Sequence, residues 1–429
     1  MTASSVAQSK AKSYPRRFTP RGYVIAAVAL GNAFEWFDIV VFGYFAAIIA
    51  QLFFPSSDPT ASLLLTLASF GIAFVMRPLG AIMLGAYADR KGRKAALQLS
   101  ILLMALGSTA IAVAPTYSAI GIFASALVLT ARLVQGFSVG GEFGSATAFL
   151  AEQNVKRRGF FASWQFASQG LAALLATGFG AVITFALTPT QVTEWGWRIP
   201  FIFGIAIAPV GFYIRNYVSE TTDFQTIRQV SSPLRSVLFH GKAGLLITFG
   251  LVVLGTVAVY TILFMPTYAV RMLSLPAPNS FAAGLLTGAI QFVLIPIFGA
   301  LSDRLGRTLI PILAAGVILV GIYPTFVWLS IEPTIYKLLV VQGLLGVVTA
   351  AYLGSLPALM SELFPVGMRG TGLSISYAFG VAIFGGFAPF IHVWLIAQTG
   401  NILAPAFYVV IAAIVSLMSL VAARQLGFR

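Results

Sequence analysis

The stretch Gly85-Ala-Tyr-Ala-Asp89-Arg90-Lys-Gly92-Arg93 recurs 214 residues later as Gly299-Ala-Leu-Ser-Asp303-Arg304-Leu-Gly306-Arg307. Glycine permits close approach of helices, an aspartate can face the N-terminus of a neighbouring helix, and arginines can pair with carboxylates at the same face. Because the offset is half of a 429-residue chain, the repeat predicts two related halves with equivalent loops.

The composition restricts the class of protein. Hydrophobic residues make up 59% of the chain and charged residues 9%, whereas soluble domains carry about 25% charged residues. This excludes a soluble enzyme. With no cysteine and two histidines far apart in sequence, we expect no metal site, and the absence of a Walker-type loop argues against ATP as the energy source. We expect no cofactor.

The sequence predicts an all-α polytopic membrane protein, because twelve apolar segments are long enough to cross about 30 Å of hydrocarbon. The fourth segment has 33 residues, so it must tilt or project past the membrane. The predicted spans are 24–50, 61–87, 95–114, 118–150, 160–186, 197–216, 243–266, 280–302, 308–331, 335–361, 371–397 and 402–424.

The basic residues predict the orientation. With the N-terminus in the cytoplasm, 21 of the 26 Lys and Arg residues fall on the cytoplasmic side, as expected from the positive-inside rule. The net charge of +14 therefore reports topology and not nucleic-acid binding. The first span follows a basic tail and is too long for a cleaved signal. We expect a multi-pass protein of the cell (inner) membrane with both termini in the cytoplasm.

The longest polar segment divides the chain into two halves of six spans. The expected order is a cytoplasmic tail at 1–23, an N-terminal half at 24–216, a cytoplasmic loop at 217–242, a C-terminal half at 243–424 and a tail at 425–429. Parallel halves related by an axis along the membrane normal are typical of transporters whose central site opens alternately to either side.

The doubled loop in a twelve-span chain resembles the major facilitator superfamily. The resemblance implies two pseudo-symmetric six-helix halves and gate residues that do not bind substrate. Solvated loop charges are the alternative, which fits any single residue but not the repeat. The expected gate residues are Gly85, Asp89, Arg90, Arg93, Gly299, Asp303, Arg304 and Arg307.

Further strings resemble the metabolite:H+ symporters, a group that includes carriers of citrate, 2-oxoglutarate, shikimate and betaine or proline. These are Gly31-Asn32-Ala-Phe-Glu35-Trp36-Phe-Asp38, Met76-Arg77-Pro78-Leu-Gly80 and Arg132-Leu-Val-Gln135-Gly136. Ala162-Ser163-Trp164-Gln165-Phe-Ala-Ser168-Gln169 and Met265-Pro266-Thr267-Tyr268 look most similar to the citrate and tricarballylate proton symporters.

Two arginines lie inside predicted spans, where charge is costly and usually lines an aqueous pathway. Arg77 precedes Asp89 by twelve residues, roughly 18 Å from the cytoplasmic end of its helix. At that depth its guanidinium can bind a carboxylate in a bidentate manner. Alternatively, it pairs with an acidic residue of the protein. For Arg132, substrate binding and a structural or coupling role stay open.

Three acidic residues inside spans are candidates for proton coupling. Glu35 and Asp38 are three residues apart and share a helix face, where both cannot ionise cheaply. Their protonation can therefore depend on whether substrate occupies Arg77. A fixed ion pair is the alternative. Glu142 fits a proton site or a gate partner, and His392 an interfacial position near a helix end.

Neutral polar residues in apolar helices complete the candidate substrate site, with helix packing as their alternative role. Gln165, Ser168 and Gln169 have the best claim because they share one helix face. With the two arginines, the expected binding residues are Arg77, Arg132, Asn32, Gln165, Ser168, Gln169, Tyr260, Tyr268, Gln291 and Tyr377. Tyr44, Thr267, Tyr352 and Ser376 are further polar residues of the candidate cavity, in which the tyrosines have the weaker claim.

These features predict a proton-coupled importer of a small organic acid, citrate or tricarballylate first. One net negative charge entering against about 100 mV costs about 2.3 kcal/mol, so co-imported cations must cancel the charge of the anion. A symporter of 2-oxoglutarate, another dicarboxylate, betaine or proline is the nearest alternative, and an efflux exchanger or a non-transporting membrane sensor are others. The expected partners are the acid, protons and the lipid bilayer, with sodium left open, no nucleic acid and a monomeric state.

Overall fold

The computed structural model describes residues 21–91, 93–140, 142–205, 237–239 and 241–428, and within these ranges there are helices but no strands. In the N-terminal half the helices are α1 (Arg21–Tyr44), α2 (Ala46–Phe53), α3 (Pro59–Lys91), α4 (Arg93–Ala112), α5 (Tyr117–Ile120), α6 (Ile122–Ser138), α7 (Glu142–Glu152), α8 (Arg158–Ala186) and α9 (Pro189–Glu194). In the C-terminal half they are α13 (Lys242–Arg271), α14 (Ala277–Leu305), α15 (Leu309–Ser330), α16 (Ile335–Glu362), α17 (Arg369–Gly380), α18 (Ala388–Thr399) and α19 (Ala404–Gln425). Short 3₁₀ turns cover Val155–Arg157, Gly196–Arg198 and Val366–Met368.

Nine helical segments of the described residues are long and apolar enough to cross a membrane, and the bent pair α1–α2 makes a tenth. The apolar part of α4, Gln98–Ala112, is shorter than a full span. The predicted all-α polytopic fold class is confirmed. Most of the predicted sixth span, 197–216, and of the central loop, 217–242, lies outside the described residues, as does the N-terminal tail up to residue 20.

Three predicted spans are interrupted. The first bends by 65° between α1 and α2. The fourth, expected to tilt or project past the membrane, is one candidate span over Ile122–Glu152 in which α6 ends at Ser138 and α7 begins at Glu142. The eleventh contains a turn of π-helix at Val381–Gly385. A Cβ at Gly385 would lie 1.9 Å from Thr256 Oγ1, so only glycine lets this turn approach α13.

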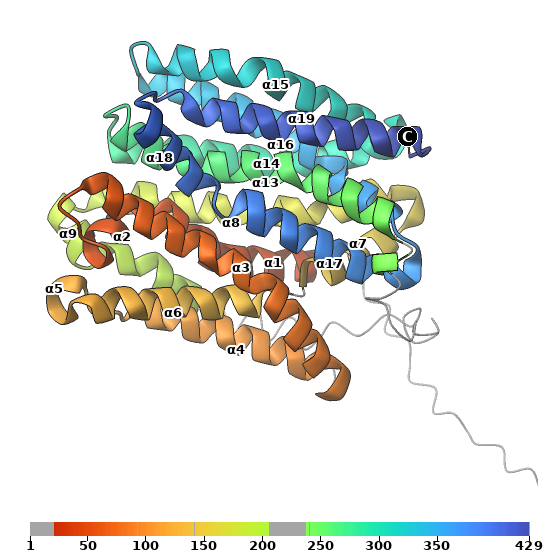
Figure 1. The fold of residues 1–429 in the computed structure, drawn as a ribbon, viewed down its shortest axis with the longest axis horizontal. Coiled ribbons are helices and arrows are strands. Elements are labelled where there is room, and N and C mark those ends of the chain that lie inside the picture. Colours follow the sequence, from red (N-terminus) through yellow and green to blue (C-terminus); the bar gives the residue numbers. More distant parts are fainter. Residues whose placement is uncertain (1–20, 92, 141, 206–236, 240, 429) are drawn as a thin grey trace, which may run out of the picture.

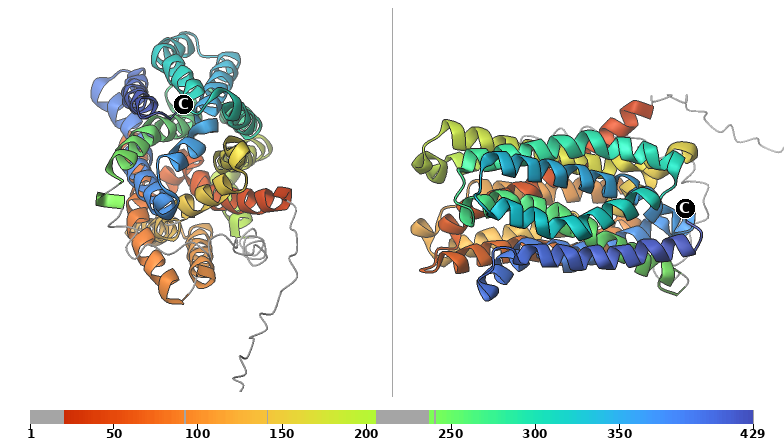
Figure 2. Two further views of the ribbon diagram at one scale, coloured as in Figure 1. Left: turned by 90° about the vertical axis from the view of Figure 1, so that its right-hand side faces the viewer. Right: turned by 90° about the horizontal axis from the view of Figure 1, so that it is seen from above.

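The long helices run side by side along the longest axis of the molecule (Figures 1 and 2). The two halves meet along α8 and α14, where glycines replace larger side chains. A Cβ at Gly159 would lie 2.3 Å from Gly299 O, and one at Gly288 would lie 2.6 Å from Leu174 N. Such contacts require glycine because any side chain would push the backbones apart.

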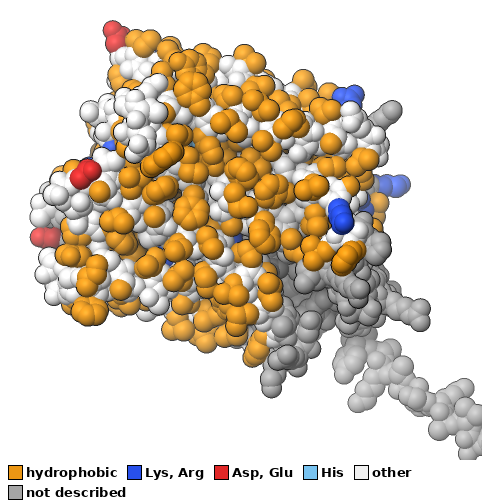
Figure 3. Space-filling model, in the orientation of Figure 1, with side chains coloured by type: hydrophobic (Ala, Val, Ile, Leu, Met, Phe, Trp, Pro, Cys, Tyr) orange, Lys and Arg blue, Asp and Glu red, His pale blue; other side chains and the backbone are white. Residues whose placement is uncertain are grey.

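The outer surface fits a bilayer. Hydrophobic side chains cover the face drawn in Figure 3, with Lys and Arg gathered at the end near the C-terminus and Asp and Glu at the opposite end. In water such a surface would favour association, whereas hydrocarbon is its natural solvent.

Candidate functional site

Arg77 is buried between the two halves, with 4% of its surface exposed. Its Cζ atom lies 4.2 Å from the ring centroid of Phe74 and 5.2 Å from that of Trp36. Nε and Nη2 have no hydrogen-bond partner within the described part of the chain. A small cavity beside it, the Arg77 cavity, is lined by Asn32, Glu35, Trp36, Arg77, Val139, Gly140, Phe143, Ser374, Tyr377 and Ala378. Two donors of a buried guanidinium are therefore available to a ligand.

Close packing of α3 against α6 and the residues that follow it fixes the position of Arg77. A Cβ at Gly80 would lie 1.9 Å from Phe137 O, and one at Gly140 would lie 2.1 Å from Arg77 O. The glycines of these two strings bring the backbones together and leave the arginine side chain to project toward α1 and α17. The glycines are thus local requirements for the position of the arginine.

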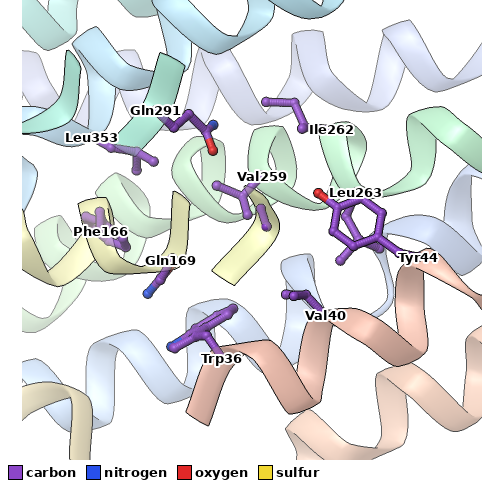
Figure 4. Close-up of a pocket in the computed structure, with 11 residues that line it drawn as sticks. Trp36, Val40, Tyr44, Phe166, Gln169, Val259, Ile262, Leu263, Gln291 and Leu353 are labelled. Carbon is purple, nitrogen blue, oxygen red and sulfur yellow. The ribbon is translucent and has the colours of Figure 1, made fainter. Parts of the chain in front are cut away.

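A second cavity, the glutamine cavity, lies between α1, α8, α13 and α14 (Figure 4). Two glutamines, Gln169 of α8 and Gln291 of α14, supply polar groups from opposite halves. The Nε2 atom of each has no hydrogen-bond partner in the described ranges. The cavity is lined by Trp36, Val40, Tyr44, Phe166, Gln169, Ala173, Val259, Ile262, Leu263, Gln291 and Leu353.

Two of the predicted tyrosines belong to this central region. Tyr377 lies beside Arg77 and Gln169, and its ring stacks on Phe143 with centroids 3.4 Å apart. The ring of Tyr260 lies 5.4 Å from that of Phe74, and its hydroxyl lacks a hydrogen-bond partner among the described residues. The C-terminal half therefore contributes two phenol groups near a guanidinium that belongs to the N-terminal half.

Arg132 lies inside the N-terminal half and lines neither cavity. Its Nη1 donates to Gln135 Oε1 at 2.8 Å, and Gln135 Nε2 donates to Ser108 Oγ at 2.9 Å. Asp38 is 6% exposed and lies beside Arg132 and Ser108. Nε and Nη2 of Arg132, like those of Arg77, have no hydrogen-bond partner among the described residues, so its separation from both cavities is what favours a structural or coupling role over direct binding of substrate.

Hydrogen bonds hold two of the three residues on the predicted polar face of α8. Asn32 Nδ2 donates to Ser168 Oγ at 2.6 Å and to Gln165 O at 3.0 Å, and Gln165 Nε2 donates to Asn32 Oδ1 at 3.1 Å. These bonds join α1 to α8. They therefore favour the alternative role of Gln165 and Ser168, in which the two residues serve helix packing. Gln169, one position further along, reaches both the glutamine cavity and Tyr377.

Several predicted residues lie elsewhere in the C-terminal half. The hydroxyl of Tyr268 donates to Ile402 O at 3.0 Å, that of Tyr352 to Leu251 O at 2.7 Å, and that of Ser376 to Leu245 O at 3.3 Å. Thr267 is buried and lines neither cavity. These contacts are interhelical packing contacts of the kind that polar groups make in membranes.

The remaining titratable residues singled out from the sequence, Glu35, Glu142 and His392, lie in different parts of the structure. Glu35 lines the Arg77 cavity, whereas Glu142 begins α7 and lines neither cavity. His392 is fully buried among helices of the C-terminal half. Its Nε2 lies 2.9 Å from Thr261 Oγ1, and its ring packs against Phe264 and Tyr408. The helix continues past it to Thr399, two residues beyond the predicted end of the span.

The second copy of the repeated loop joins the two halves. Asp303 accepts hydrogen bonds from the backbone N–H groups of Gly159 at 2.8 Å and Phe160 at 3.1 Å, and Arg307 Nη1 donates to Asp303 Oδ1 at 2.7 Å. Arg304 is exposed. We call this region the Asp303 end. In the first copy, the side chains of Gly85, Asp89, Arg90 and Arg93 lie outside the described part of the structure.

Two ion pairs at the Asp303 end were missed by the sequence analysis. Arg158 Nη1 lies 3.2 Å from Glu362 Oε1, and Arg369 Nη1 lies 2.7 Å from Glu152 Oε1. In the first pair the arginine belongs to the N-terminal half and the glutamate to the C-terminal half, and in the second pair the order is reversed. A signal was present, because each Arg-Gly pair follows an acidic residue six or seven positions earlier at the end of the preceding span.

Apolar contacts close the opposite end, which we call the Phe45 end. The rings of Phe45 and Phe281 lie 5.6 Å apart, joining the α1–α2 bend to α14. A Cβ at Gly43 would lie 2.6 Å from Leu263, and one at Gly71 would lie 2.6 Å from Phe387. Among the described residues, contacts between the halves are therefore present at both ends of the two central cavities.

Comparisons with known proteins give the family. Residues 24–244 match the sugar (and other) transporter family. The chain is 38% identical to a citrate-proton symporter of Klebsiella pneumoniae, over 92% of this chain and 90% of that one. The chain belongs to the major facilitator superfamily. This transporter is also 34% identical to an alpha-ketoglutarate permease of Escherichia coli, over 93% of this chain and 92% of that one.

A solved structure supports the fold of the transporter independently. The crystal structure of a D-xylose-proton symporter superposes with a TM-score of 0.73, covering 92% of this chain and 97% of that one at 17% identity. At that identity the match supports the architecture alone. The predicted membership in this superfamily and among its metabolite:H+ symporters is confirmed by the family match and by the citrate-proton symporters of 37–38% identity.

Proposed function

We propose that this transporter imports a small organic acid together with protons, with citrate or tricarballylate as the first candidates. The observation that carries the proposal is Arg77, a buried guanidinium with two unpartnered donors at the boundary of the two halves. The similarity to citrate-proton symporters supports the same substrate class. The protein acts as a monomer in the cell (inner) membrane, with both termini in the cytoplasm.

In this proposal Arg77 binds a carboxylate of the substrate. Arginine keeps its charge in an apolar site and offers parallel N–H groups that match a carboxylate. Trp36 and Phe74 hold the guanidinium in place by cation–π contact. Glu35 lines the same cavity, so its protonation responds to the arrival of a second negative charge.

The proton-coupling site in the proposal is Asp38 with Arg132. The carboxylate of Asp38 is buried, and its Oδ1 atom has no hydrogen-bond partner among the described residues. A buried acid beside an arginine changes its interaction with that arginine when it binds a proton. Phe70 contacts both Arg132 and Tyr260, which connects this cluster to the substrate region. Glu142 takes the role of gate partner.

Alternating access follows from the unequal closures of the two ends. At the Asp303 end, ion pairs and a charged helix cap join the halves, whereas aromatic and aliphatic contacts do so at the Phe45 end. Water and substrate charges can replace the first kind of contact, and the second kind separates by rigid-body rocking around the central site. The first copy of the repeated loop takes the equivalent gating role.

Import of 2-oxoglutarate is the second candidate, which the 34% identity to an alpha-ketoglutarate permease favours. The two are separated by competition in proteoliposomes loaded with purified transporter. Labelled citrate is offered with excess tricarballylate, 2-oxoglutarate or betaine. We expect tricarballylate to inhibit uptake most strongly. Absence of citrate uptake, together with uptake of labelled 2-oxoglutarate, would replace the first candidate by the second.

A further inference from the structure

We infer that Gln169 and Gln291 form a second, uncharged subsite that binds the acid group of the substrate farthest from Arg77. The inference rests on the proposed function and specifies which organic acids the site selects. It concerns the glutamine cavity, which is separate from the Arg77 cavity and shares only Trp36 with it.

The positions of the two glutamines depend on the closest approach of α8 and α14. A Cβ at Gly170, next to Gln169, would lie 2.8 Å from Phe292 N and 3.0 Å from Gln291 Cβ. The missing side chain at Gly170 therefore brings amides of opposite halves to one cavity. Figure 4 shows both glutamines above a wall formed by Trp36, Val40 and Tyr44 of α1.

Both amides have unused hydrogen-bonding capacity. The side chains are 7% and 5% exposed for Gln169 and Gln291, and neither Nε2 has a hydrogen-bond partner in the described residues. A buried polar group without a partner is costly, so such groups usually have a ligand or a water to satisfy them. The other lining residues are apolar apart from the Tyr44 hydroxyl and the Trp36 ring nitrogen. The cavity therefore has few polar groups, and two of them are amides from opposite halves.

The two cavities lie on either side of one aromatic side chain. Trp36 lines both, and Arg77 lies over its ring. Tyr377 lies beside both Arg77 and Gln169, so polar groups continue from the charged cavity to the uncharged one. A substrate whose outer acid groups are far enough apart, as in tricarballylate, can bind on both sides of Trp36, whereas a shorter diacid such as succinate, or a monoacid, reaches Arg77 alone.

Neutral amides suit the far acid group for an electrostatic reason. A second arginine would require a full counter-charge in a low-dielectric region, and its desolvation is expensive. An amide donates to a carboxylate or a protonated carboxyl without that penalty, so the subsite accepts either state. Because Gln169 and Gln291 belong to opposite halves, the bound acid also holds the halves together at the centre.

Competition by two unlabelled acids tests the inference. Succinate is tricarballylate without one carboxymethyl arm, so the ratio of their inhibition constants against labelled citrate measures recognition of the far acid group. The variants are Gln169→Leu and Gln291→Leu. Each variant is expected to weaken the binding of tricarballylate about tenfold and the binding of succinate little. The preference for tricarballylate over succinate therefore falls by about that factor.

Gln342→Leu is the matched control. Gln342 is a buried glutamine of the same half as Gln291 that accepts a hydrogen bond from Thr287 and lines neither cavity. Its substitution leaves the ratio unchanged. The ratio is measured within each variant, so it does not depend on the amount of folded protein. If a leucine variant does not fold, isosteric Gln291→Glu gives the same test, because its carboxylate repels the far acid and lowers the preference.

The outcomes separate this inference from the proposed function. If wild-type transporter accumulates no citrate, tricarballylate or 2-oxoglutarate, the proposed function fails first. If wild type transports citrate and the Gln169 and Gln291 variants keep its preference for tricarballylate, the second subsite is overturned while the proposed function stands. An equal loss of the preference for tricarballylate in the Gln342 variant also overturns the second subsite, because the loss then does not depend on the glutamine cavity.

Discussion

Asp303 of the C-terminal half caps the first turn of α8 in the N-terminal half, accepting from Gly159 N at 2.8 Å and Phe160 N at 3.1 Å. A carboxylate at a helix N-terminus satisfies free N–H groups and interacts favourably with the helix dipole. Here the cap crosses the boundary that must open during transport. The Asp303 end is thus held by a contact that exists in only part of the cycle.

Asp303→Asn is expected to favour opening at this end. Loss of a charged cap costs about 1–2 kcal/mol, which raises the open fraction roughly tenfold. The chain has no cysteine, so a single Ser163→Cys, buried beside Gly299, reports opening through its rate of alkylation. Asp58→Asn is the control, because Asp58 caps Thr60 N within one half. Equal labelling rates with and without Asp303→Asn would contradict the gating role.

Arg77→Lys is expected to weaken citrate binding by roughly tenfold to a hundredfold. Lysine keeps the charge but loses the fork of parallel donors and the stacked planar contact with Phe74. The measurement is the citrate Kd of the purified variant, with Tm showing that it folds. Arg271→Lys, at an exposed arginine of α13, is the control and retains normal affinity. An unchanged Kd for Arg77→Lys would assign this arginine to packing.

Asp38→Asn is expected to separate substrate exchange from proton coupling. Asparagine resembles the protonated acid beside Arg132, so the step that needs deprotonation is lost while substrate still binds. Counterflow of labelled citrate persists, and accumulation driven by a pH gradient falls more than tenfold. Glu194→Gln, at an exposed position, leaves both activities intact. Normal gradient-driven accumulation in the Asp38 variant would move coupling to another acid.

Gly136→Ala is expected to destabilise the N-terminal half. The added Cβ would lie 1.8 Å from Ala73 O, so α3 and α6 must separate, at a cost of about 1–3 kcal/mol. Thermal unfolding in detergent measures this as a lower Tm. Gly316→Ala is the control, since nothing lies within 4 Å of its added Cβ and alanine favours a helix. A Tm equal to wild type for Gly136→Ala would contradict the observed packing.

The helical architecture could be predicted from the sequence because the features that indicate it are long or repeated. Apolar segments near 20 residues and a doubled loop require no knowledge of side-chain contacts, and the helices α13 to α16 begin and end within five residues of the predicted bounds. The interruptions at Phe45 and Val381–Gly385 were not predicted. They depend on tertiary packing, such as that of Gly385 against Thr256, which hydropathy does not record.

The sequence identified several residues of the candidate site but not the contacts that each of them makes. Arg77 was identifiable because charge is rare in apolar spans, and it does lie between the halves. Gln165 and Gln169 looked equivalent on one helix face, yet Asn32 engages only the first. The role of each polar residue of α8 depends on how α1 and α14 are rotated and how closely they approach. The residue pattern of α8 alone does not show which of its polar side chains faces a neighbouring helix and which faces a cavity.

Uptake of labelled citrate into proteoliposomes under an imposed pH gradient tests the central proposal most directly. Vesicles containing the purified transporter are compared with an acidic exterior, with no gradient, and with the gradient collapsed by a protonophore. The account predicts accumulation above the equilibrium level only with the acidic exterior, and its loss when the protonophore is added. Citrate levels that are the same under all three conditions would contradict proton-coupled import.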